Sequence, residues 1–500
     1  MKKKLLFFAV TLSTVLSLSI TAFAESSATS STGTIIEAFA KSNAAIVSAV
    51  ISAVLLLIVF VFSKKLKTGL SRSTASSLTN AFIAFFSISG IACLAMAFAT
   101  DGQTWSNLMH VSSDIGMPRS QFEDYIQCLK SAGSQNFDRT AATTTPFAHL
   151  IYFIIAQFLP TKLIFSETIA EYAAILKNQT FMFLYLLLVV FCMVLLYRMN
   201  RAVLRRNELK TRAELVSFLL VVSYPSVYCI EKGNIAVFSL VLIMLFMLLR
   251  NAEKPLIKEL SYVSLAAAAA ITPASLFFVL LLLEEKSKKC IMRIVRTIAY
   301  FLILFISPAV FTGFGNLLTY LKNFVSVSGT GFVAGNMSIA NLLHFFGISN
   351  NLLIYAVVIL TEIIAVLALI TLPSVWQKTA AAAYVILNIF SVSDAVAIIF
   401  VFIPFIFLLA EKEHKATDWL YLLTFTLLVT PFPEWFRGDA QYFAAFLSTM
   451  GIFEIRNANN LICLAAAQFL FILLFSQMAS VLKSRKEKKE NAKTLFSNKK

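Results

Sequence analysis

The stretch TFMFLYLLLVVFCMVLLY (residues 180–197) runs without interruption into RMNRAVLRR (residues 198–206). As a helix, the first stretch would rise about 27 Å, close to the roughly 30 Å of hydrocarbon in a bilayer. Arginines that directly follow an apolar stretch indicate a cytoplasmic end. The pair therefore predicts a transmembrane helix that ends in the cytoplasm, and it sets the direction of the neighbouring segments.

The whole chain is apolar enough for lipid to be its solvent. Of its 500 residues, 59% are hydrophobic and 14% are charged, whereas soluble domains average about 45–50% apolar and about 25% charged residues. The net charge of +16 comes from Lys and Arg in short clusters between apolar stretches, which is typical of cytoplasmic loops and not of a nucleic-acid-binding domain. The six Cys form no CxxC pair and the four His are scattered, so we expect no metal site.

The two ends of the chain are predicted to lie outside the bundle. Residues 1–24 resemble a secretory signal peptide, with a basic start, an apolar stretch and a small-x-small sequence before Glu25; an uncleaved anchor is the alternative. Residues 25–43 are predicted to be an exported flexible stub, and the multi-spanning domain covers 44–482. Residues 483–500 form a basic cytoplasmic tail, which could contact anionic lipid headgroups.

The expected fold is all-α, a polytopic transmembrane helical bundle in the cell membrane. Flanking charges place the longest polar loop, residues 100–146, on the external face. The expected spans are 44–63, 81–99, 180–197, 215–230, 235–249, 297–313, 352–372, 380–392, 395–409, 416–431 and 461–482.

Two further segments are irregular. Residues 147–159 are apolar, but as a helix they would reach only about 20 Å, so we expect a re-entrant or interfacial helix. Residues 261–283 are interrupted at Thr272-Pro273, where the proline breaks the helix, and basic residues flank both sides. We interpret them as two half-helices that dip in from the cytoplasm, because broken helices at membrane depth face protein or water. A single kinked span is the alternative.

Five short motifs occur in a recognisable order. They are Phe122-Glu123-Asp124-Tyr125, Thr145-Pro146-Phe147-Ala148, the stretch from Tyr224-Pro225 to Gly233-Asn234, the alanine-rich residues before Thr272-Pro273, and Asn336-Met337-Ser338. Over roughly residues 80–410 this set resembles glycosyltransferase family 87, whose members are multi-spanning enzymes with the GT-C fold. Thr272 stands where that family usually has Lys, and only one proline stands at 146.

The resemblance implies a hexosyltransferase. It would move a mannose-like hexose from a polyprenyl-phosphate sugar to an envelope glycan or lipid acceptor on the external face, by direct displacement and without a further cofactor. An acceptor hydroxyl needs a base to take its proton, and we predict Asp124 for this role, with Asp114 and Glu123 as alternates. The predicted substrate-binding residues are Glu231, Lys232, Gly233, Asn234, Asn336 and Ser338; the four from 231 to 234 also fit an ordinary turn that contains Asn.

Two other functions stay open. A transporter or flippase of a lipid-linked envelope precursor would suit a polytopic protein, but such folds commonly contain paired broken helices, and the sequence shows one clear break, at Pro273. An inactive GT-C relative that serves as a scaffold would explain the missing Lys at Thr272. Glu362 lies within an apolar span, where an acid is expected to be functional or paired with a neighbour.

Overall fold

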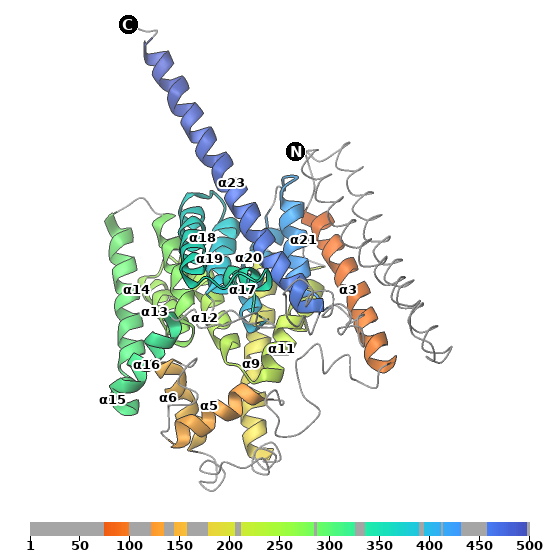
Figure 1. Cartoon of the computed structure of the whole chain (residues 1–500), viewed down its shortest axis with the longest axis vertical. Helices are drawn as coiled ribbons and strands as arrows, with labels where there is room; N and C mark the ends of the chain where they lie inside the picture. Colours follow the sequence, from red (N-terminus) through yellow and green to blue (C-terminus); the bar gives the residue numbers. More distant parts are fainter. Residues whose placement is uncertain are drawn as a thin grey trace. The chain divides into compact units, whose positions relative to one another are not determined.

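The computed structural model describes residues 75–99, 122–134, 145–157, 179–205, 212–284, 288–325, 336–389, 395–411, 414–431 and 458–497. The chain divides into the units Met1–Arg72 and Ser73–Lys500, and all of these residues belong to the second unit. The predicted signal peptide, stub and first span lie outside them. The described part of the chain is helical and contains no strand, which confirms the all-α prediction (Figure 1).

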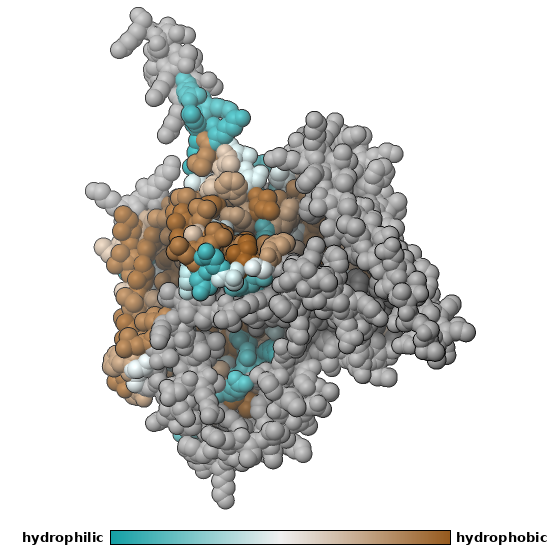
Figure 2. Space-filling view, in the orientation of Figure 1, coloured by the Kyte–Doolittle hydropathy of each residue, from teal (hydrophilic) through white to brown (hydrophobic). Residues whose placement is uncertain are grey.

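Within the described residues, six segments are long and apolar enough to cross a membrane. They are Ser77–Ala95, Phe183–Leu204, Ala213–Lys232, Cys290–Phe311, Asn351–Thr371 and Ile462–Glu487. These segments and the apolar helices between them are α3 (Ala75–Ala99), α9 (Gln179–Leu204), α10 (Ala213–Val221), α11 (Tyr224–Lys232), α12 (Ala236–Leu249), α13 (Pro255–Ile271), α14 (Lys288–Ile306), α18 (Asn351–Thr371), α19 (Val375–Asn388), α20 (Phe402–Leu409), α21 (Asp418–Val429) and α23 (Ala458–Ser497). Figure 2 shows apolar surface along its left edge, where α14 lies.

Further helical elements complete the bundle. They are α5 (Glu123–Ser134), α6 (Pro146–Ala156), α15 (Ala309–Thr312), α16 (Phe314–Val325), α17 (Ile339–Phe345) and the 3-10 helices η2 (Pro273–Glu284) and η3 (Ala395–Val401). Helix α6 has 11 residues, so it is too short to span a bilayer, as the sequence predicted.

The break at Pro273 produces two antiparallel half-helices. Helix α13 ends at Ile271, and η2 continues from Pro273. The Arg250 guanidinium, just before α13, donates a hydrogen bond of 3.5 Å to the carbonyl of Leu281, near the end of η2. The chain therefore returns to the end from which it entered, as the interpretation of two half-helices requires. The two halves match in length, at about 25 Å and about 24 Å.

A second break, which the sequence analysis missed, divides the predicted span 215–230. Helix α10 stops at Val221 and α11 restarts at Tyr224 with Pro225 in its first turn. Two serine hydroxyls, from Ser223 and Ser226, donate to the carbonyl of Leu220 at 2.7 and 3.1 Å. They satisfy a backbone acceptor at the break, so the irregular backbone is tolerated in an apolar bundle. The bundle therefore contains a second interrupted helix besides the one at Pro273.

Two helices extend beyond their predicted limits. Helix α14 begins at Lys288 instead of 297, and α23 continues to Ser497 instead of ending at 482. The sequence interpretation stopped both spans where charges begin. Charged side chains on a helix that leaves the hydrocarbon are solvated or paired, so they do not end the helix. The first residues of the predicted tail, such as Lys483, are exposed.

A buried polar network joins α17, α18 and α19. The Asn388 amide donates to Glu362 at 2.8 Å and to Thr361 at 3.1 Å, and its carbonyl oxygen accepts the N–H of Ile339 at 2.9 Å. The Glu362 carboxylate is therefore paired with a bundle neighbour, which was one of the two expectations for an intramembrane acid. Because these groups are out of reach of water, each depends on the others for its hydrogen bonds.

We expect Asn388→Leu to destabilise the bundle strongly. The substitution leaves the N–H of Ile339 and the carboxylate of Glu362 without this partner, at a cost of about 2–4 kcal/mol. The matched control is Asn350→Ala, which removes the exposed N-cap of α18 and should cost only about 1 kcal/mol. Thermal unfolding of the detergent-solubilised protein measures both; equal shifts in melting temperature would contradict the structural role of Asn388.

Candidate functional site

Helix α5, which carries Asp124, lies against the turn between α11 and α12. The turn forms because Gly233 takes a left-handed conformation, with φ of +73°, and ends α11. A Cβ atom at Gly233 would lie 2.5 Å from the Cβ of Tyr125 and 3.3 Å from the Cα of Phe122. Glycine is therefore required at this position for two reasons: its backbone angle and the close approach of α5.

The approach of α5 brings the predicted base next to a predicted binding residue. The Asn234 side-chain amide donates a hydrogen bond of 2.8 Å to Oδ2 of Asp124. Its carbonyl oxygen accepts the backbone N–H of Ala236 at 2.9 Å, which fixes the direction in which the amide points. Residues 110 positions apart in the chain are thus joined at one place.

The backbone beside Asp124 is held in an uncommon conformation. Phe122 has φ of +57°, the one positive value among the described residues other than glycine. Its N–H donates to the carbonyl of Glu231 at 2.7 Å. Positive φ is unfavourable for a bulky side chain and persists when surrounding contacts impose it. The turn at Glu231 therefore determines where α5 begins and how Asp124 is presented.

Three tyrosines surround the base of α5. The ring of Tyr125 lies 4.4 Å from that of Tyr185 on α9 and 6.1 Å from that of Tyr152 on α6. Burial raises the pKa of Tyr125, and burial, followed by the charges of Cys128 and Asp124, raises the pKa of Tyr152 well above its usual value. Both phenols are therefore neutral at physiological pH. Sequence reasoning gave these tyrosines no role, because only packing brings them together.

Helix α6 connects α5 to the break at Pro273. The hydroxyl of Thr145 accepts the N–H of Ala148 at 3.1 Å, which caps α6, and donates to the carbonyl of Ile271 at 3.4 Å. That carbonyl is available because Ser275 donates to Thr272 instead, in the tighter 3-10 pattern. Thus two more of the motifs found in the sequence, around Thr145 and Thr272, are in contact.

Two basic side chains of the region are buried. Lys232, the last residue of α11, is 7% exposed, and its Nζ lies 5.9 Å from the centre of the Tyr228 ring. Burial lowers the pKa of His149 on α6 to about 4, so its imidazole is neutral at physiological pH. Lys232 therefore supplies positive charge close to the Gly233 turn, whereas His149 supplies none.

The other predicted site residues are placed differently. Asn336 and Ser338 are buried in a cap of α17, where the Ser338 hydroxyl donates to Asn336 Oδ1 at 2.6 Å. The intervening Met337 carbonyl accepts a hydrogen bond of 2.8 Å from Gln468 of α23. Glu123 is the first residue of α5, and Asp114 lies outside the described residues. Substrate contact by Asn336 and Ser338 stays a prediction.

The profile of glycosyltransferase family 87 matches residues 145–404, just over half of the chain. The chain belongs to glycosyltransferase family 87. With six candidate spans in the part of it that the structure describes, it is a multi-pass membrane glycosyltransferase. Comparisons with curated proteins and with solved structures give no significant match. Within the described residues, no three His, Cys, Asp or Glu side chains are grouped to hold a metal ion.

The family match begins after Asp124 and contains the turn at Gly233. The hydrogen bond from Asn234 therefore attaches the predicted base to the part of this family 87 protein that the profile recognises. The matched region also contains Thr272, the position where the sequence resemblance leads us to expect Lys. Thr272 directly follows Ile271, whose carbonyl accepts the Thr145 hydroxyl, so this position lies next to the start of α6.

We expect Gly233→Ala to displace α5. The added methyl group meets Tyr125 and the backbone must abandon its left-handed angle, so α5 loosens. Cys128 reports this movement, because it lies on α5 and is partly exposed whereas the five other cysteines are buried. A membrane-impermeant maleimide should label Cys128 faster in G233A. Gly90→Ala is the control, since its Cβ meets no described atom within 4 Å; unchanged labelling in G233A would contradict the role of this contact.

Proposed function

We propose that this family 87 protein transfers a hexose from a polyprenyl-phosphate sugar to an envelope glycan or lipid acceptor on the external face of the cell membrane. The observation that carries the proposal is the 2.8 Å hydrogen bond between Asn234 and Asp124. It holds a carboxylate at the turn that the family profile includes. Charge patterning supports the external face. Arg201 lies in the last turn of α9 and Arg250 ends α12, so the basic, cytoplasmic ends of these helices are the ends far from the Gly233 turn.

Asp124 would act as the general base. The acceptor hydroxyl oxygen attacks the anomeric carbon of the donor as its proton passes to the Asp124 carboxylate. The bond between that carbon and the phosphate oxygen breaks, and the polyprenyl phosphate leaves with the electron pair. Because Asn234 donates to Oδ2, it would orient the carboxylate for the acceptor. Such base assistance commonly contributes about 10²–10⁴ in rate.

The buried Lys232 would stabilise the leaving phosphate. Its charge is partly desolvated, and electrostatic interactions are stronger in such surroundings. In this chain, Thr272 stands where the family pattern usually has Lys. Lys232 is the described cation closest in sequence to the Gly233 turn. The donor is itself the activated species, so the proposal includes no separate cofactor. Gly233 would position α5, and Glu231 would fix its start through the bond to Phe122.

We expect Asp124→Asn to reduce kcat by about 10²–10⁴-fold. The amide keeps the shape and an oxygen that accepts from Asn234, but it takes no proton at neutral pH. Transfer of radiolabelled sugar from a polyprenyl-phosphate donor by the purified protein measures this. Glu253→Gln, an exposed acid in the turn before α13, should retain full activity. Full activity in D124N would place the base elsewhere, and wild-type inactivity with every donor would favour the scaffold.

We expect Asn234→Ala to have a smaller effect than loss of the base. It removes one hydrogen bond to a charged group, worth about 1.5–3 kcal/mol. Because Asp124 is still there to take the proton, kcat should fall only about 10–100-fold. Steady-state kinetics with the same donor measure the loss. A normal kcat in N234A would show that the contact with Asp124 is structural only.

A further inference from the structure

Three arginines lie on one face of α9 at its cytoplasmic end. They are Arg198, Arg201 and Arg205, which are three and four residues apart and are therefore neighbours on the helix surface. Glu214, at the start of α10, faces them. Arg201 lies 2.8 Å from its Oε1, and Arg205 pairs with the same oxygen. We call these four residues the α9–α10 cluster.

The α9–α10 cluster has an excess of positive charge. Three guanidinium groups meet one carboxylate, so its net charge is +2. Arg198 is exposed, and within the part of the chain that the structure describes its side chain has no ion pair or hydrogen bond. The cluster therefore has a cation available for a ligand, next to two others that share one acid.

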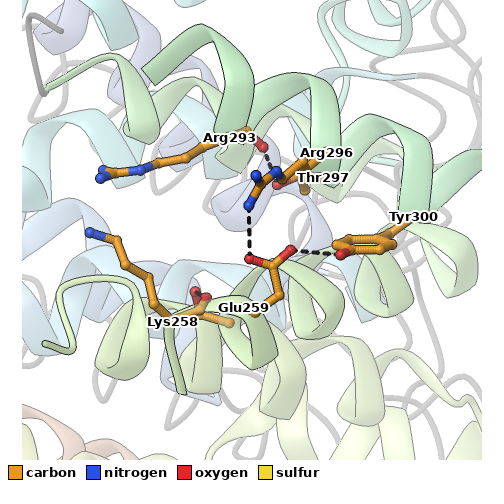
Figure 3. A network of polar contacts seen from close by, with 7 residues as sticks. Lys258, Glu259, Arg293, Arg296, Thr297 and Tyr300 are labelled. Atoms are coloured by element: carbon orange, nitrogen blue, oxygen red, sulfur yellow. Dashed lines mark hydrogen bonds and ion pairs between the residues drawn. The ribbon is translucent and has the colours of Figure 1, made fainter. Parts of the chain in front are cut away.

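The ion pairs between α13 and α14 are arranged differently (Figure 3). There the carboxylate of Glu259 accepts a hydrogen bond of 2.6 Å from the Tyr300 hydroxyl at one oxygen and lies 3.4 Å from Arg296 at the other. Each oxygen of Glu259 thus has one of these partners, and the contacts fasten the two helices together. In the α9–α10 cluster a single oxygen of Glu214 has two cationic partners.

The cluster lies at the end of two stripes of exposed apolar side chains. On α10, Leu215 and Phe218 are 44% and 54% exposed. On α9 the stripe follows the same face as Arg198, and its members are 47–63% exposed: Phe183, Leu187, Phe191 and Val194. In a multi-pass membrane protein such stripes face acyl chains. Because Glu214 joins the two helices at this edge, the charges lie where the apolar surface ends.

The cluster is at headgroup level and far from the candidate catalytic site. The apolar part of α9 ends at Tyr197 after about 27 Å, so Arg198 reaches the polar border, and its charge marks the cytoplasmic side. Near the other end of α9, the ring of Tyr185 lies 4.4 Å from that of Tyr125, which follows Asp124. Arg198 lies about 20 Å further along the helix than Tyr185.

We propose that the α9–α10 cluster binds the phosphodiester headgroup of an anionic phospholipid in the cytoplasmic leaflet. The planar guanidinium of Arg198 donates two parallel hydrogen bonds to the phosphate. Arg201 and Arg205 add positive charge that Glu214 offsets only in part, so a headgroup with net negative charge is favoured over a zwitterionic one. The acyl chains lie along the stripe of α9. This lipid site is independent of the proposed transfer reaction.

Lipid selectivity tests the proposal. Full-length protein is reconstituted in nanodiscs that mix phosphatidylglycerol with phosphatidylcholine, and native mass spectrometry measures the ratio of the two lipids that stay bound. Arg198→Gln should lower the preference for phosphatidylglycerol about 5-fold. Its side chain has no partner in the described part of the chain, so the fold should persist. Lys415→Gln removes the same charge from an exposed position before α21 and should leave the ratio unchanged. No loss in R198Q, or equal loss in both variants, would overturn the site.

Glu214→Gln should change the ratio in the opposite direction. It raises the net charge of the cluster to +3, so the preference for phosphatidylglycerol should rise about 5-fold. A misfolded protein does not gain selectivity for one lipid, so this increase would support the site by itself. Glu253→Gln, the matched control, removes an exposed acid in the turn before α13 and should have no effect. Unchanged or weaker selectivity in E214Q would contradict the proposal.

Free phosphate is the other source of the same chemistry. Excess inorganic phosphate should release no more phosphatidylglycerol than sodium chloride of equal ionic strength, because the acyl chains hold the lipid on the apolar stripe. Greater release by phosphate than by chloride would replace the lipid site with a small-anion site.

Discussion

The hydrogen bond between Asn234 and Asp124 is the contact on which the arrangement of this membrane transferase depends. It can form because Gly233 has no side chain and adopts a left-handed angle, which lets Tyr125 approach to a distance that any Cβ would prevent. The same turn orients the Asn234 amide through Ala236 and holds Phe122 in a positive φ. One glycine thereby sets both the position and the direction of the carboxylate.

Prolines shape the rest of the bundle by interrupting helices where other groups satisfy the backbone. At Pro273 the freed carbonyl of Ile271 accepts the Thr145 hydroxyl, so the break also positions α6. Before Pro225, serine hydroxyls donate hydrogen bonds to the carbonyl of Leu220. Unsatisfied backbone groups are costly in lipid. The break at Pro273 is thus also a point of contact between segments that are distant in sequence, whereas the break before Pro225 is satisfied by its own neighbours.

Charge is distributed to opposite ends of the same helices. The acid of the proposed catalytic site and the buried Lys232 lie at one end of α12, whereas Arg250 and the cations of α13 and α14 lie at the other. A bilayer favours this separation, because cations accumulate in cytoplasmic loops and meet anionic headgroups there. The proposed catalytic site therefore lies at the end of α12 opposite to these cations.

The sequence alone determined the helical class, the positions of most spans, the short helix at α6 and the break at Pro273, because apolar length and proline chemistry act locally. Its ordered motifs also indicated the family that the profile shows. It missed the early start of α14 and the tyrosines packed at α5, because their partners come from other helices. It also missed the break before Tyr224, where nearby serine hydroxyls satisfy the backbone. Only the tertiary structure decided that Asp124 meets Asn234, since that contact requires the chain to bring together residues 110 positions apart.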